Sequence, residues 1–137
     1  TDIWTLMREI QLPPELRVGQ GYGKVSWAVR TFWEQYVGWF KLRSTTELYP
    51  DPVPAALAEL VDAVGTDATL ARAEAALERG DAVVAIRLGE AVEAVVPDDP
   101  RLATLMARSH QHLLDTGGDV SFWEHGWLKT QLARWTS

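Results

Sequence analysis

The sequence predicts an all-α protein, built as a helical array with tetratricopeptide-like helix pairs, and three features support this. Segments with the alternating pattern of strands are nearly absent. Glycine and proline recur at the spacing of helix ends. Stretches rich in alanine fill the second half of the chain between these residues. We therefore expect seven or eight helices and no sheet.

The first half is divided by prolines and glycines. Pro13-Pro14 ends one short helix, and Pro14 can open a turn because proline suits the first helical position. Glycines at 19, 21 and 23 form a loop before a long helix, which a proline-rich connector follows. The expected elements are a helix over 3–10, a turn over 14–18, a helix over 24–42 and a connector over 44–54.

The second half has more regular punctuation. Gly65 stops one helix, and Thr66 or Asp67 can cap the next through its side-chain oxygen. Gly80 and Asp81 mark the next boundary in the same way. Pro100 starts a further helix, which Gly117-Gly118 end. The expected helices cover residues 55–64, a segment ending at 79, a segment from 81 to 96, 100–116 and 120–135.

A weak internal repeat lies in this half. Ala73 and Gly80 recur 34 and 37 residues later as Ala107 and Gly117. The spacing resembles the tetratricopeptide repeat, in which small residues let paired helices pack closely. One repeat and a fragment fall short of the roughly three that a free-standing solenoid needs. We therefore expect the repeat to pack against the other helices.

Composition excludes several functional classes. A net charge of −6 with scattered lysines and arginines argues against nucleic-acid binding. The absence of cysteine excludes disulfides and thiolate zinc sites. No apolar run approaches the roughly 20 residues that span a bilayer, so no membrane partner is expected. With no leader sequence and no initiator methionine, we expect one domain cut from a longer protein that is cytoplasmic, periplasmic or secreted.

Residues 21–40 hold seven of the 13 aromatic side chains. On a helical wheel the apolar arc covers roughly half the circumference, whereas one core needs only about a 100° stripe. Because rings left in water are unfavourable, a second surface must cover the surplus. Other helices of this chain are one possible cover, and a second copy is the sharper hypothesis. The predicted interface residues are Phe32, Trp33, Tyr36, Trp39 and Phe40.

Trp27 falls on the opposite, polar side of the same helix, beside Lys24 and Glu34. It can lie exposed on the surface without a partner, fold onto the glycine loop, or point outside the domain.

The last helix also carries two apolar stripes, which core packing explains most simply.

No active site is legible. His110 and His112 lie two residues apart on a helix and point about 160° from each other, so they cannot share a metal. His125 lacks a second ligand at metal-binding spacing. Ser109 and His110 lack an orienting carboxylate and an oxyanion hole. The glycines before position 24 lack the lysine and hydroxyl residue of a phosphate loop. We expect no catalytic residue and no metal site in this chain.

Six segments occur in a telling order: LPPEL (12–16), GYGKVS (21–26), YVGWF (36–40), GTDATLARAEAALERGD (65–81), VVPDDPRLATLMARSHQHL (95–113) and FWEHGWL (122–128). Together they resemble the alkyl sulfatase dimerisation domain. The resemblance implies a helical middle domain, residues 1–137, of a bacterial hydrolase of sulfate esters. It implies a preceding metallo-β-lactamase-type catalytic domain with two zinc ions. The expected partners are a second copy and that catalytic domain.

Two departures from the family pattern stand out. Many members carry Ser-His-Asn at the start of the aromatic helix, with the histidine facing the catalytic domain. The matching residues here are Ser26, Trp27 and Ala28, and an indole cannot replace the proton chemistry of an imidazole. The family's Asp-Gly-Asn-Pro connector is replaced by Lys41-Leu42-Arg43-Ser44. The resemblance makes Tyr22, Ser26 and Trp27 a possible edge of the parent's active site.

Two other hypotheses come from different classes. A free-standing tetratricopeptide-like module would bind peptides as a monomer, but it leaves the aromatic helix unexplained. A small enzyme would need a site that the residues do not show.

Overall fold

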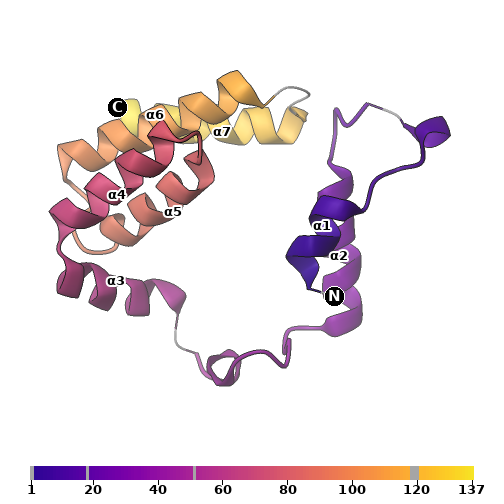
Figure 1. Cartoon of the computed structure of the whole chain (residues 1–137), viewed down its shortest axis with the longest axis horizontal. Coiled ribbons are helices and arrows are strands. Elements are labelled where there is room, and N and C mark those ends of the chain that lie inside the picture. The colour runs from indigo at the N-terminus through magenta and orange to yellow at the C-terminus, as the bar shows by residue number, and fades with distance from the viewer. Residues whose placement is uncertain (1, 18, 51, 118–120) are drawn as a thin grey trace. The chain divides into compact units, whose positions relative to one another are not determined.

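The computed structural model describes residues 2–17, 19–50, 52–117 and 121–137. Over these residues the chain forms seven α-helices and two short 3₁₀ helices and no strand (Figure 1), which confirms the predicted all-α class. None of the helices in this part of the chain is long and apolar enough to cross a bilayer. The element ends expected at Val18, Gly118 and Val120 lie outside the described residues.

The chain divides into two compact units, which we describe separately. Unit 1 comprises Thr1–Pro50 and Asp119–Glu124, and unit 2 comprises Asp51–Gly118 and His125–Ser137. Helix α7, Phe122–Thr136, contributes residues to both.

Unit 1 is built around two helices, α1 (Ile3–Glu9) and α2 (Val25–Val37), which pack against each other (Figure 1). The Asp2 side chain caps α1 by accepting a hydrogen bond from the Thr5 N–H at 3.1 Å. Hydrogen bonds from the Thr5 hydroxyl and N–H hold the pKa of the Asp2 carboxyl below its ordinary value. The 3₁₀ helices of this unit are η1 (Pro14–Leu16) and η2 (Thr45–Leu48).

Helix α2 is shorter than the predicted helix over 24–42. It ends at Val37 because Gly38 has φ of 72°, a conformation that favours glycine and stops a helix. The Gly38 N–H still donates to the Glu34 carbonyl at 2.9 Å. Trp39 and Phe40 therefore lie beyond the helix, and their predicted places on its wheel are wrong.

The start of α7 contacts the loop before α2 within unit 1. The Phe122 N–H donates to the Gly21 carbonyl, 101 residues earlier in the sequence. The buried Ser121 hydroxyl accepts from the Glu124 N–H at 3.2 Å, as an N-cap side chain does. The Lys24 ammonium lies 2.5 Å from the Glu124 carboxylate. These contacts bring the glycine loop and the first turn of α7 together.

Unit 2 contains α3 (Val53–Val64), α4 (Thr66–Glu78), α5 (Ala82–Glu93) and α6 (Pro100–Thr116). The bounds expected for α6 are confirmed at both ends. Gly65, with φ of 96°, is both the C-cap of α3 and the N-cap of α4. The prediction that Thr66 or Asp67 caps α4 is therefore wrong. Helix α5 ends at Glu93, three residues before the expected Val96, because Pro97 has no N–H to donate to the Glu93 carbonyl and disfavours helical backbone at Val96.

Small side chains let α4, α5 and α6 pack closely (Figure 1). Ala73 and Ala85 are fully buried, and a methyl group added to Gly89 would lie 2.4 Å from the Met106 sulfur. Trp135 of α7 packs against this core, and Arg134 pairs with Glu93 of α5. Tetratricopeptide-like pairing stays a prediction. The core residues are Val61, Leu70, Ala73, Ala76, Leu77, Ala82, Ala85, Ala91, Val92, Leu102, Leu105 and Met106.

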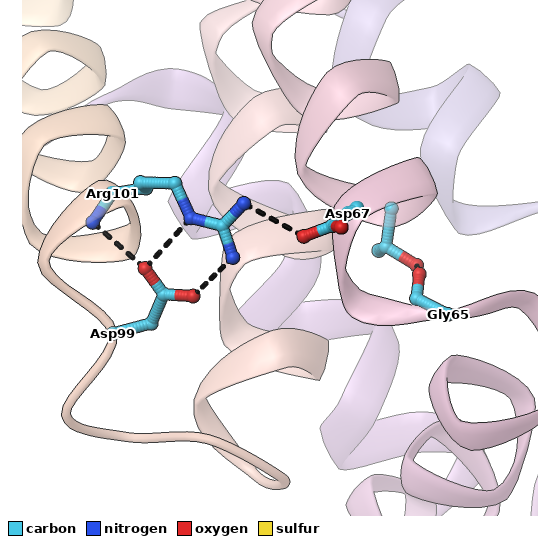
Figure 2. Close-up of polar contacts among 5 residues, drawn as sticks. Gly65, Asp67, Asp99 and Arg101 are labelled. Carbon is cyan, nitrogen blue, oxygen red and sulfur yellow. Dashed lines mark hydrogen bonds and ion pairs between the residues drawn. The ribbon is translucent and has the colours of Figure 1, made fainter.

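One arginine joins the start of α6 to the start of α4 (Figure 2). The Arg101 guanidinium donates to Asp67 at 2.7 Å and to both oxygens of Asp99 at 2.6 and 3.0 Å. Asp99 also caps α6 by accepting from the Arg101 N–H at 2.9 Å. These bonds lower the pKa of Asp99 and raise that of Arg101.

We expect Gly89→Val to destabilise unit 2 by about 1–3 kcal/mol, because the new side chain would overlap Met106 and Leu102. Urea unfolding followed by circular dichroism measures this. Gly126→Val is the matched control, since a methyl group added there meets no atom within 4 Å. Equal stability of the two variants would contradict the close packing of α5 on α6.

We expect Asp99→Asn to lower the thermal unfolding midpoint at neutral pH, and the difference from the unaltered chain to vanish in acid. Asparagine keeps the capping oxygen and removes only the charge. Because the folded pKa of Asp99 is depressed below 3.8, its charge stabilises above 3.8, and this contribution is lost as pH falls through the folded pKa. Asp98→Asn removes the same charge one residue earlier as a control. A pH-independent difference would show that the ion pair does not contribute.

Candidate functional site

The exposed rings of unit 1 form the most distinctive surface of the described residues. No residue of α2 is fully buried. Phe32 is 61% exposed and Tyr36, one turn later on the same face, is 91% exposed. Trp39, beyond the helix, is 73% exposed. Three of the five predicted interface residues are therefore left open by their own unit.

The other two predicted interface residues, Trp33 and Phe40, are only partly exposed. The Lys41 ammonium lies 5.0 Å from the centroid of the Trp33 ring, and the Arg43 guanidinium lies 5.4 Å from it. Both cations are thus within the range of attraction by the ring face. The Phe40 ring lies 5.6 Å from the Trp39 ring at an angle of 32°. Trp33 and Phe40 are therefore partly covered by neighbouring side chains and contribute less exposed area than the other three rings.

The loop after α2 is held by its own contacts. The Lys41 N–H donates to the Glu47 carboxylate at 2.6 Å, and the Lys41 ammonium donates to the Gly38 carbonyl. Leu42 lies between Lys41 and Arg43 in the sequence. Its backbone φ is 58°, and its side chain is 81% exposed. It is the one described residue other than glycine with positive φ.

A groove of about 830 Å³ runs between α1 and α2. The sequence did not reveal it, because nothing in the local pattern indicates which helix packs against α2. The groove is lined by three of the predicted interface residues, Phe32, Trp33 and Tyr36, and also by Trp27. Its other lining residues are Leu6, Ile10, Leu12, Gly23, Lys24, Val25, Ala28, Val29 and Thr31.

The second predicted site, Tyr22, Ser26 and Trp27, lies at the start of α2. Tyr22 is exposed, and its ring lies 6.0 Å from that of Phe122. Phe122 in turn lies 5.6 Å from Trp123 in an edge-on arrangement. Trp27 is 37% exposed, with the Lys24 ammonium 6.0 Å from its ring, and Ser26 is half-buried. Sequence reasoning missed Phe122 and Trp123, which join this aromatic cluster from the far end of the chain.

The histidines form no site with one another. The buried His110 ring bonds to the Met106 carbonyl through Nδ1 at 2.7 Å, and the Ser109 hydroxyl donates to the Leu105 carbonyl at 2.8 Å. Each is therefore engaged with its own helix one turn earlier. Within the described ranges, no three histidine or carboxylate side chains lie close enough to hold a metal ion.

Comparison with known proteins gives one positive result. No curated protein and no solved structure is significantly similar to this chain. A family model described as alkyl sulfatase dimerisation matches residues 3–121. The match spans most of the chain, including α2 and the loop that follows it. The chain therefore belongs to the alkyl sulfatase dimerisation family.

Proposed function

We propose that this chain is the dimerisation domain of a larger zinc hydrolase of sulfate esters. Two copies associate through α2 and the loop that follows it. Family membership supports self-association, and the exposed rings supply a surface for it. A dimerisation domain is not catalytic, which agrees with the expectation that this chain is not itself the enzyme.

The exposed rings carry the proposal. A buried aromatic side chain covers roughly 150–250 Å², so the exposed parts of Phe32, Tyr36 and Trp39 amount to roughly 350–550 Å². A standard interface buries about 800 Å² on each partner. The three rings thus supply about half of such an interface, and tyrosine and tryptophan are the residues that most often dominate binding energy.

Charge also favours association through this part of the chain. Residues 1–50 carry six basic and five acidic side chains, whereas residues 51–118 carry five basic and twelve acidic ones. Two nearly neutral surfaces repel each other little, while two strongly acidic ones repel. Beside the exposed rings, Arg30 and Glu34 pair with each other at 2.9 Å. Neither charge of that pair has to find a partner in the second copy.

The role of the parent protein rests on family membership alone. In the parent protein, the two zinc ions that the resemblance implies would be held by the separate catalytic domain, while the described residues of this chain show no group of side chains that could hold a metal ion. The aromatic cluster of Tyr22, Phe122 and Trp123, with Ser26 and Trp27, is the surface that we propose borders that domain. The substrate would then lie near the indole of Trp27, at the position where many family members have the imidazole of a histidine.

We expect the unaltered chain to form a dimer and Tyr36→Glu to raise its dissociation constant at least tenfold. A charge on the most exposed ring of the face would have to be desolvated on association. Sedimentation velocity over a concentration series measures the change. Because Tyr36 makes little contact with its own unit, the variant should remain folded.

Gln35→Glu is the matched control, since it adds the same charge to the same helix about 100° around its axis. It should leave the dissociation constant within about twofold, well below the tenfold effect that 1.4 kcal/mol produces. A monomeric unaltered chain at high micromolar concentration would refute the proposed function. Equal weakening by both substitutions would place the interface elsewhere.

A further inference from the structure

Leu42 adopts a backbone conformation that its side chain disfavours. Its φ of 58° lies in the left-handed region, where a Cβ atom comes too close to the following carbonyl oxygen. Such strain persists only where surrounding contacts enforce it, and it is often associated with function. Here the enforcing contacts come from the neighbours on both sides, Lys41 and Arg43, which lie over the same Trp33 ring.

The Leu42 side chain contributes little to the stability of its own unit. It is 81% exposed, so it buries little apolar surface. Glycine would adopt the same backbone conformation without strain and would leave no apolar side chain in water. A leucine here is explained if its side chain is buried by something outside the unit.

The same unit carries an apolar recess that can accept such a side chain. The groove between α1 and α2 has a volume of about 830 Å³ and is lined by Leu6, Ile10 and Val29 among others. In a two-fold dimer the same patch serves both subunits, so each copy must present both the projection and the recess. Unit 1 has both: Leu42 with Trp39 beyond α2, and the groove beside α2.

We propose that Leu42 of one copy inserts into the groove between α1 and α2 of a second copy. The inference rests on the proposed function, because it assumes the homodimer. A second copy is favoured as the occupant because the groove is continuous with the proposed interface through Phe32 and Tyr36. The loop is already held by Glu47 and Trp33, so its ordering cost on association is low.

Leu42→Asn tests the contribution of the side chain. Asparagine tolerates positive φ, so the fold is kept while the apolar contact is lost. We expect the dissociation constant to rise at least tenfold and the thermal unfolding midpoint of the dilute protein to stay unchanged or rise. Leu42→Gly should behave in the same way. Leu16→Asn, at another exposed leucine of unit 1, should leave the dissociation constant unchanged.

Cross-linking tests the geometry, and the absence of cysteine makes the background clean. Leu42→Cys carrying a size tag is mixed with untagged Ile10→Cys and treated with a short bismaleimide. Ile10 lines the groove and is partly exposed. We expect a product of mixed size as the main species, and none when Leu16→Cys replaces Ile10→Cys. Mixing two single variants excludes cross-links within one chain.

The outcomes separate this inference from the proposed function. A dimer that is weakened by Tyr36→Glu but indifferent to Leu42→Asn and Leu42→Gly would overturn the inference and leave the proposed function standing. A dimer that yields only same-variant products, or none, would overturn it as well. An unaltered chain that stays monomeric would overturn both.

Discussion

The structure of unit 1 depends on one imbalance, which is that a 13-residue helix rich in aromatic side chains packs against a seven-residue helix. The shorter α1 cannot cover the circumference of α2. Ile3 is the only described residue of the two helices that is fully buried. Since apolar surface favours burial by roughly 25 cal/mol per Å², a helix left this open is most stable with a further surface against it.

The end of α2 directs the rings to different environments. Gly38 stops the helix, so Trp39 leaves the line of Phe32 and Tyr36. The chain beyond Gly38 then returns two cations to the face of Trp33, which removes that ring from the exposed set. Between these two cations in the sequence, Leu42 has a left-handed conformation and an exposed side chain. The loop that covers the Trp33 ring thus also carries an exposed aliphatic side chain.

The helices of unit 2 bury their apolar side chains against one another. Alanines and Gly89 let α4, α5 and α6 approach closely, and Leu102, Leu105 and Val92 fill the space between them. Its acidic side chains remain on the surface, some of them paired with arginine, as Asp67 is with Arg101 and Glu74 with Arg108. The unit therefore has a complete core of its own, which unit 1 lacks.

By itself, the sequence determined the all-α class, most helix boundaries and the surplus of rings in residues 21–40. These follow from local backbone preferences and composition, as the agreement at Pro100 and Thr116 illustrates. The tertiary structure alone decided that Trp33 is covered, that Leu42 is exposed, and that Phe122 joins Tyr22. The stop at Gly38 was missed because the aromatic residues Trp39 and Phe40 follow it directly and continue the apolar pattern of the helix. Exposure depends on which distant segments meet, and side-chain spacing along one helix does not carry that information.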